Sequence, residues 1–226
     1  YTTFPSIKDN NTKTKFKQMY YPKFIDDQCV VKNDCELNKN IALTGPNASG
    51  KTTVLKSAFI NILLSQQFGI GCFNSLILTP YNKLHCYLNI PDTSGRDSLF
   101  QAEARRCKDI IDIIDNNKDE RHFCIFDELY SGTNPEEAVS SALSFMDYIV
   151  KNDNVTCILT THYVKLCKKL AKNDKITNYN MKTIKKLDNF KYTYLIKKGI
   201  SKIKGGLKVL SDLNYPKEIL ENTNQN

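Results

Sequence analysis

The sequence predicts an α/β fold in which helices flank a mixed, largely parallel sheet. Short apolar runs alternate along the chain with longer segments whose apolar residues recur at helical spacing. This alternation is typical of βαβ units, which bury parallel strands between layers of helices. The length of 226 residues and the 41% of hydrophobic residues suit one domain with a small appendage.

The first part of the chain, residues 1–40, is polar and rich in Lys and Asn. We expect it to lead in from an upstream domain and to supply short strands and loops to the same fold. Residues 41–44 form an apolar run that breaks at Gly45, and apolar residues recur at helical spacing after Gly50. This pattern predicts a strand, a glycine-bounded loop and a helix.

The segments after this helix continue the alternation. The predicted strands are residues 75–79, 85–90, 122–126 and 155–160, residues 91–96 are a predicted loop, and the predicted helices run from Ser98 to the 116–119 loop and from Asn134 to about Val150. The second of these helices has a clear start signal, because Asn134 is a good cap residue and is followed by Pro135 and two glutamates.

The remainder of the chain alternates again over residues 177–181 and 192–196, which predicts a hairpin. Gly205, Gly206 and two short helices are expected to follow. The sequence therefore predicts three parts, which are the lead-in segment 1–40, a core over residues 41–200 and a small helical element over residues 201–226.

The net charge of +8 is concentrated near the end of the chain. Residues 165–208 hold fourteen lysines and two aspartates, a net +12, which leaves −4 for the rest. Such a basic region can face nucleic acid or an acidic partner. The alternative is a solvated surface in a Lys- and Asn-rich chain, since the aromatic residues here alternate like strand residues.

Several classes of protein are excluded by composition. No run approaches the roughly 18 apolar residues of a membrane span, so we expect no membrane partner. The eight cysteines form no CxxC pair and the three histidines form no Cys/His cluster, which disfavours disulfides and structural zinc. We expect reduced thiols in an intracellular compartment: cytoplasm, nucleus, organelle or viral replication site. Tyr1 begins no signal peptide, and we expect a piece of a longer protein.

A phosphate-binding loop is predicted where the first core strand meets the first helix. Residues 45–52 match the pattern GxxxxGK(S/T) in the strand–loop–helix context that the pattern requires. Backbone N–H groups and a helix N-terminus then surround a phosphate, Lys51 reaches the β- and γ-phosphates, and Thr52 is a ligand for Mg²⁺. The candidate binding residues are Gly45, Pro46, Asn47, Ala48, Ser49, Gly50, Lys51, Thr52 and Thr53.

Two acids, Asp127 and Glu128, end the apolar strand 122–126 at the sheet edge where this loop emerges. Asp127 is a candidate ligand of Mg²⁺, directly or through water. Glu128 is a candidate catalytic residue that polarises the water attacking the γ-phosphate. Alone, two acids at a strand end are also compatible with a surface turn, and the upstream loop favours the catalytic interpretation.

His162 follows the next buried strand in the same manner, after Thr160 and Thr161. It is a candidate catalytic residue, with Lys51, that contacts the γ-phosphate. A histidine in this position can instead be a simple polar or capping residue. The turn 131–134 between the two strands suits either a contact with a dimer partner or a plain connection.

Four segments in this order resemble the ATPase domain of the MutS family, which includes DNA mismatch-repair proteins and belongs to the ABC-type ATPase superfamily. The segments are LTGPNASGKTT, SGRDSLFQAE, CIFDELYSGTNPEEA and ILTTHY. The resemblance extends from Tyr21 to about Glu218 and identifies a divergent member. It implies a P-loop NTPase fold with ATP and Mg²⁺, and a helix-turn-helix-like dimerisation element over residues 201–226.

The resemblance also implies roles for individual residues. Asn47 matches a position close to the terminal phosphate, and Ser98 matches a serine that reaches across a dimer to the partner's nucleotide. Because SGRDSLF carries one extra residue, Ser94 is the alternative to Ser98. Val30 and Val31 lie where adenine packs in the family, without the usual aromatic residue.

The function implied by the resemblance is ATP hydrolysis at composite sites in a homodimer, or in a heterodimer with a related ATPase domain. Nucleotide state would then be coupled to DNA binding by upstream domains. An ABC ATPase of the SMC/Rad50 type is one alternative, although the LSGG-type signature and an inserted coiled coil are absent between Gly50 and Asp127. A weakly hydrolysing, nucleotide-gated dimerisation module is the other, favoured by the shifted signature and the missing aromatic residue.

Overall fold

The computed structural model describes most of the chain. The described residues are 4–7, 13–88, 98–186, 189–201, 203, 210, 211, 213–216, 218 and 219. Within them, no helix is long and apolar enough to cross a membrane.

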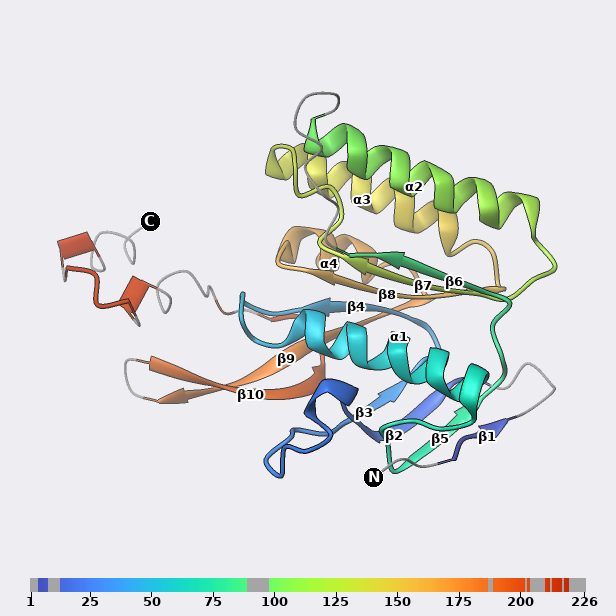
Figure 1. Ribbon diagram of the computed structural model, residues 1–226. Coiled ribbons are helices and arrows are strands. Elements are labelled where there is room, and N and C mark those ends of the chain that lie inside the picture. The colour runs from blue at the N-terminus through green and yellow to red at the C-terminus, as the bar shows by residue number, and fades with distance from the viewer. Residues whose placement is uncertain are drawn as a thin grey trace.

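A six-stranded sheet in the order β10-β9-β4-β8-β7-β6 runs through the centre of the structure (Figure 1). Its strands are β4 (Asn40–Thr44), β6 (Lys83–Tyr87), β7 (His122–Asp127), β8 (Val155–Thr161), β9 (Ile176–Lys186) and β10 (Asn189–Lys198). Five of them pair in parallel, and β10 is antiparallel to β9 at the edge. This confirms the mixed, largely parallel sheet that the sequence predicts.

Helices cover both faces of this sheet. As Figure 1 shows, α1 (Lys51–Phe68) lies on one face, and α2 (Leu99–Asn116), α3 (Pro135–Ile149) and α4 (Val164–Leu170) lie on the other. Successive residues of β4 point to opposite faces, so Ile41 and Leu43 join the core beneath α1 while Ala42 joins the core beneath the other helices. Burial on both faces explains why the strands are apolar throughout.

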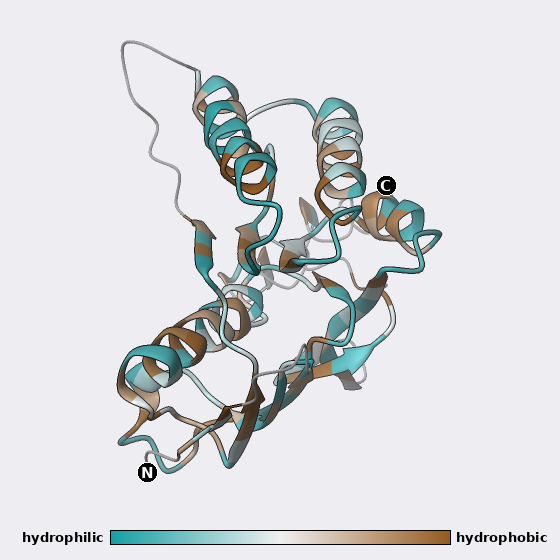
Figure 2. Ribbon diagram, turned by 90° about the vertical axis from the view of Figure 1, so that its right-hand side faces the viewer, coloured by the Kyte–Doolittle hydropathy of each residue, from teal (hydrophilic) through white to brown (hydrophobic). Residues whose placement is uncertain are grey.

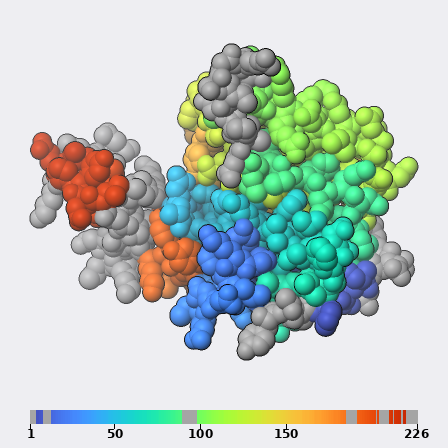
Figure 3. All heavy atoms as spheres, in the orientation of Figure 1, coloured from blue at the N-terminus to red at the C-terminus, as the bar shows by residue number. Residues whose placement is uncertain are grey.

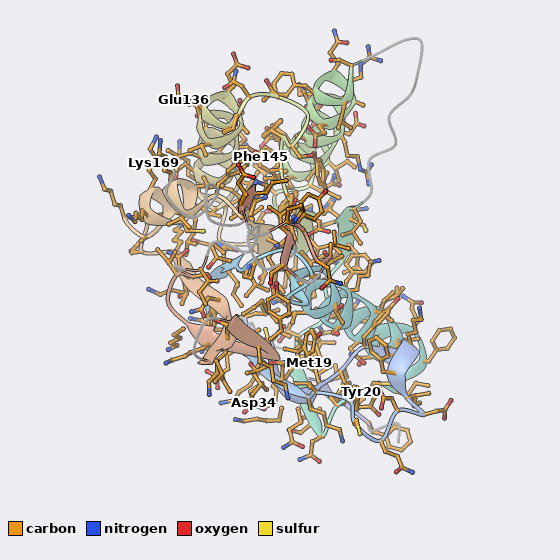
Figure 4. The ribbon with its side chains drawn as sticks, turned by 90° about the vertical axis from the view of Figure 1, so that its left-hand side faces the viewer. Met19, Tyr20, Asp34, Glu136, Phe145 and Lys169 are labelled. Carbon is orange, nitrogen blue, oxygen red and sulfur yellow. The ribbon has the colours of Figure 1, made fainter. Side chains whose placement is uncertain are left out.

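Large side chains from the helices and from the sheet fill the core beneath α2 and α3. Phe145 of α3, labelled in Figure 4, packs its ring edge-on against Phe126 of β7 with 5.2 Å between the centroids. Cys107, Ile110 and Ile114 of α2 are also buried, whereas the rest of that helix is largely hydrophilic (Figure 2). This amphipathic pattern is the one the sequence predicts for the helix.

Both predicted helix starts are confirmed. The Ser98 hydroxyl accepts a hydrogen bond from the Gln101 N–H, and the Gln101 side chain accepts one from the Ser98 N–H, which is a capping box. The Asn134 side chain accepts from the N–H groups of Glu136 and Glu137 at the start of α3. Pro135 occupies the first turn of that helix, where its missing N–H costs nothing.

A second, smaller sheet packs on the other side of α1. It has the order β1-β5-β2-β3 and consists of β1 (Ser6–Ile7), β2 (Lys15–Met19), β3 (Asn33–Glu36) and β5 (Ser75–Leu78), with the short 3-10 helix η1 (Pro22–Phe24) between β2 and β3. The predicted strand 75–79 therefore belongs to this sheet and not to the main one. Its partner β2 comes from the lead-in segment, and buried Phe16, Leu76 and Leu78 join them to the core beneath α1.

The hairpin near the end of the chain is longer than predicted, because β9 also pairs in parallel with β4 as a full member of the main sheet. Residues 187 and 188 between its strands lie outside the described residues. So do residues 89–97, with the predicted loop 91–96 and the end of the predicted strand 85–90. Most of the predicted dimerisation element 201–226, including Gly205 and Gly206, also lies outside them.

Candidate active site

The phosphate-loop sequence forms the connection between β4 and α1. Gly50 caps α1 with a φ of 96°, a left-handed backbone conformation that residues with side chains rarely adopt. A Cβ atom at this position would also lie 3.2 Å from the Tyr194 ring. Ala48 is also left-handed, with a φ of 60°. The first turn of α1 contains no acidic residue, so the positive end of the helix dipole faces the loop without a competing carboxylate.

Lys51 is the first residue of α1 and is buried, with 5% of its surface exposed. Its Nζ atom lies 3.3 Å from the Pro46 carbonyl oxygen, 3.4 Å from Asn47 Oδ1 and 3.3 Å from Glu128 Oε1. A buried ammonium requires such acceptors, and here they come from the loop itself and from Glu128, the residue that follows β7. The positive charge therefore lies inside the loop.

Asp127, the last residue of β7, faces the second residue of α1. The Thr52 hydroxyl donates a hydrogen bond of 2.9 Å to Asp127 Oδ2, and the Thr160 hydroxyl donates to Asp127 Oδ1. The pairing of Asp127 with Thr160 in the β7–β8 register places that second contact. A carboxylate and a hydroxyl side by side are hard oxygen donors of the kind that Mg²⁺ prefers.

Glu128 lies between the two positively charged or ionisable groups of the site. Its Oε1 atom contacts Lys51 at 3.3 Å, and its Oε2 atom lies 3.5 Å from Nδ1 of His162. The hydrogen bond from His162 and the charge of Lys51 lower the pKa of Glu128 to about 2, although partial burial acts in the opposite direction. Glu128 is thus ionised throughout the physiological pH range.

The backbone at Glu128 is unusual. Its φ is 53°, in the left-handed region that only a small fraction of non-glycine residues adopt. Its N–H donates a hydrogen bond of 3.0 Å to the Thr160 carbonyl oxygen, which extends the β7–β8 pairing by one residue. The reversal that follows aims the carboxylate at Lys51 and His162.

His162 directly follows β8 and has 42% of its side chain exposed. Its ring stacks obliquely on that of Tyr163, with 4.1 Å between the centroids. The structure therefore brings Lys51, Asp127, Glu128 and His162 to the carboxyl ends of β7 and β8, beside the loop after β4. This is the edge that the sequence predicts.

A cavity of about 700 Å³ opens beside Lys51, Asp127 and Glu128, whereas His162 does not line it and reaches it only through its contact with Glu128. Of the predicted binding residues, Asn47, Ala48, Gly50, Lys51, Thr52, Thr53, Val30, Val31, Asp127 and Glu128 line it. Gly45, Pro46 and Ser49 form the loop behind this surface, and the Ser49 hydroxyl is buried without a hydrogen-bond partner. The volume is that of an ordinary small-molecule site.

One wall of the cavity comes from residues that the sequence did not single out. Tyr21 and Phe24 line it from the lead-in segment, and Tyr194 lines it from β10. Figure 3 shows the orange atoms of the hairpin directly beside the blue atoms of the N-terminal segment. Sequence patterns identify these aromatic residues only as strand or loop residues, because nothing local indicates that segments about 170 residues apart meet here.

A polar side chain fixes the position of Tyr194. The β9–β10 register shifts between Tyr192 and Ile196, and Tyr194 within this bulge has a φ of 58°. Buried Asn33 of β3 donates from Nδ2 to the Tyr194 carbonyl oxygen at 3.0 Å and accepts from the Ile196 N–H at 2.8 Å. The bulge is therefore held against the second sheet.

Ser98 is not among the described residues that line this cavity. It is exposed at the start of α2, where its hydroxyl caps the helix. Ser94, the alternative to it, lies outside the described residues. The structure therefore does not bring Ser98 together with the phosphate loop of the same chain.

The residues present fit a magnesium-bound polyphosphate. A buried ammonium and a helix N-terminus suit phosphate oxygens, while Thr52 and Asp127 suit the metal. Within the described ranges no three His, Cys, Asp or Glu side chains cluster to hold a metal alone. Mg²⁺ is commonly held in this way, by one or two protein oxygens with phosphates and water completing its shell.

Comparison with known proteins gives a consistent family. The family model described as MutS domain V matches residues 41–226. The chain is 28% identical over 203 residues to a DNA mismatch repair protein MutS of Chlorobaculum tepidum, with 86% of this chain and 22% of that protein covered. It is 30% identical over 200 residues to a DNA mismatch repair protein MutS of Parabacteroides distasonis, with 85% and 22% covered.

A second group of relatives carries another name. The chain is 27% identical over 207 residues to an Endonuclease MutS2 of Lactococcus lactis subsp. cremoris, with 89% of this chain and 26% of that protein covered. The chain thus spans about a quarter of the length of the curated relatives that it matches.

Proposed function

Since this chain belongs to the MutS domain V family, we propose that it binds ATP with Mg²⁺ in the cavity beside α1 and hydrolyses the γ-phosphate. It acts as the ATPase module of a longer, MutS-like protein. Its resemblance to the MutS family also places it within the ABC-type ATPase superfamily. The observation that carries this proposal is the convergence of Lys51, Asp127, Glu128 and His162 around one phosphate loop. A loop with a purely structural role would not require all four of these side chains.

The loop and α1 bind the phosphates. Lys51 turns its ammonium from the loop carbonyl and Glu128 to the β- and γ-phosphates, and Asn47 and the loop amides lie close to the terminal phosphate. Thr52 and Asp127 hold Mg²⁺, which when bound neutralises charge on the phosphates. The apolar and aromatic wall formed by Val30, Val31 and Tyr194 packs against the adenine.

Glu128 orients the water that attacks the γ-phosphate, and His162 holds Glu128 and contacts that phosphate. With a pKa of about 2 the carboxylate is a weak base in the geometry described here.

The complete site is composite. Ser98 lies outside the cavity of its own chain, and at an exposed helix start it is free to approach the nucleotide of a partner. We assign it that role in a homodimer or in a heterodimer with a related domain, with residues 201–226 as the dimerisation element. Nucleotide state then changes the dimer contact, and through further domains of the full-length protein it changes the grip on DNA.

Substitution of Lys51 tests nucleotide binding. We expect Lys51→Ala to abolish detectable binding of ATP with Mg²⁺ in calorimetry, because the cavity loses its only cation among the described lining residues. Lys56→Ala, on the same helix but outside the cavity, is the matched control and should bind as wild type does. Unchanged affinity in Lys51→Ala contradicts the phosphate-loop assignment.

A further inference from the structure

A buried carboxylate outside the cavity contacts the segment that follows the two site acids. Glu103 of α2 is 2% exposed. Its Oε1 atom accepts hydrogen bonds from the Ser131 N–H at 3.0 Å and the Ser131 hydroxyl at 2.8 Å, and its Oε2 atom accepts from the Gly132 N–H at 3.1 Å. Burying a carboxylate is costly, and three donors on one short turn offset that cost.

The turn that Glu103 holds is under backbone strain. Tyr130, like Glu128 two residues earlier, is left-handed, with a φ of 58°. For a bulky side chain this conformation is an outlier, and it persists only where the surroundings determine it. The hydrogen bonds from residues 131 and 132 to Glu103 supply that restraint directly after the strained segment.

The same turn packs against the first residues of α2. A Cβ atom at Gly132 would lie 2.8 Å from the Phe100 backbone nitrogen and 2.8 Å from Leu99 Cγ, so only glycine allows this approach. The Phe100 and Tyr130 rings are also in contact, with 5.7 Å between their centroids. Ser98 immediately precedes these residues, so the start of α2 and the end of β7 form one packed unit.

We propose that Glu103 is a positioning residue that locks the backbone after Asp127 and Glu128 to the start of α2. The geometry of the catalytic carboxylate and the placement of Ser98 are thereby set by one shared contact. This inference rests on the function proposed above, because it gives Glu103 an effect on hydrolysis. Glu103 does not line the cavity, so it acts on Glu128 through the backbone and leaves nucleotide affinity untouched.

The test compares Glu103→Gln with the matched control Glu137→Gln in the full 226-residue chain. Glutamine keeps the shape of the side chain but presents an N–H₂ group to one of the three donors. Glu137 accepts a hydrogen bond from Thr133 on the same connection, but it is exposed. We expect Glu103→Gln to lower kcat at least about tenfold, with the ATP dissociation constant unchanged within about twofold, because small misplacements of catalytic groups are costly. Glu137→Gln should retain both values.

A second measurement keeps the inference separate from the proposed function. Amide hydrogen exchange reports local opening in the absence of turnover. We expect Glu103→Gln to accelerate exchange over residues 128–132 and over 98–101 together, and Glu137→Gln to change neither segment. If the wild-type chain binds ATP but does not hydrolyse it, the proposed function fails, and the exchange data still decide the role of Glu103.

Two further variants cover the case in which Glu103→Gln does not fold. Ser131→Ala removes one donor, and Gly132→Ala forces the turn away from Phe100 by a different route. Both should lower kcat with affinity retained. Wild-type kcat in the folded variants, equal losses of kcat and affinity, or exchange that changes in only one of the two segments would overturn the inference.

Discussion

Glu128 is the residue at which the backbone, the electrostatics and the proposed chemistry meet. Its left-handed conformation directs the carboxylate back toward α1, and its two oxygens separate Lys51 from His162. Lys51 in turn has acceptors only from the loop and from Glu128 among its described contacts. These side chains satisfy one another in the structure, and among them the Lys51 ammonium can exchange an acceptor for a phosphate oxygen.

The low pKa of Glu128 predicts a pH-dependent contribution to stability. The pKa of Glu128 is about 2 in the folded state and has its ordinary value of about 4.5 in the unfolded chain, so the stabilisation is fully present above about pH 4.5 and is lost as the pH falls toward 2. One pKa unit corresponds to about 1.4 kcal/mol. Because nearly a third of the side chain is exposed and screened by solvent, we expect about 1 to 2 kcal/mol.

Chemical denaturation of wild type and Glu128→Gln between pH 3 and pH 6 measures this contribution. Other carboxylates titrate in both proteins, so the difference between their free energies of unfolding isolates Glu128. We expect the advantage of wild type to shrink on going from pH 6 to pH 3. A difference that stays constant over this range shows that the contacts with His162 and Lys51 do not stabilise the charge.

At the scale of elements, local signals in the sequence predict those parts of the fold that local chemistry determines. The caps at Ser98 and Asn134 satisfy helix N–H groups within a few residues of themselves, so the sequence alone places both helix starts. The loop between β4 and α1 is equally local. These elements carry Lys51 and Thr52, which is why this half of the site is predictable.

Other elements owe their positions to distant partners. β5 pairs with β2 and β1, and β9 extends the main sheet beyond β4, although neither pairing leaves a pattern within the strand itself. The bulge that presents Tyr194 depends on Asn33, far away in the sequence. The aromatic residues of the cavity wall therefore cannot be derived from periodicity, whereas the resemblance to the family places Val30 and Val31 beside them.

The position of Tyr194 in the cavity wall predicts that this residue contributes to the affinity for ATP. We expect Tyr194→Ala to weaken ATP binding at least about fivefold, since stacking of a base on an aromatic ring contributes about 1 to 3 kcal/mol. Tyr194→Phe keeps the ring and should retain most of the affinity. Calorimetric titration of both variants measures the effect. Equal affinities for Tyr194→Ala and wild type would contradict the assignment of the hairpin to the nucleotide site.

Across the whole molecule, the exposed lysines of the basic region lie apart from the cavity, although Tyr194 of the same region lines it. Among the residues whose burial the structure describes, the exposed lysines of α4, the turn after it and the hairpin are Lys165, Lys168, Lys169, Lys172, Lys182, Lys191, Lys197 and Lys198. None of these lines the cavity, and Lys169 is seen at the outer side of α4 in Figure 4. These lysines therefore add no charge to the cavity wall, a distinction that the sequence alone does not make.

The fold class and the convergence of the phosphate loop, the acid pair and the histidine could all be predicted, because parallel strands bring their carboxyl ends to one edge. The coupling between α2 and the end of β7 could not. Glu103 resembles any helical glutamate in the sequence, and only tertiary packing buries it beneath Ser131 and Gly132. Buried polar contacts of this kind depend on geometry that periodicity does not encode.

The most direct test of ATP hydrolysis at this site is phosphate release with ATP and Mg²⁺ by wild type and by Glu128→Gln, with binding measured in parallel. We predict that the variant binds ATP as wild type does but turns over at least about a hundredfold more slowly, because the attacking water is no longer polarised. Full steady-state activity in Glu128→Gln would contradict the assignment of this site as the catalytic centre.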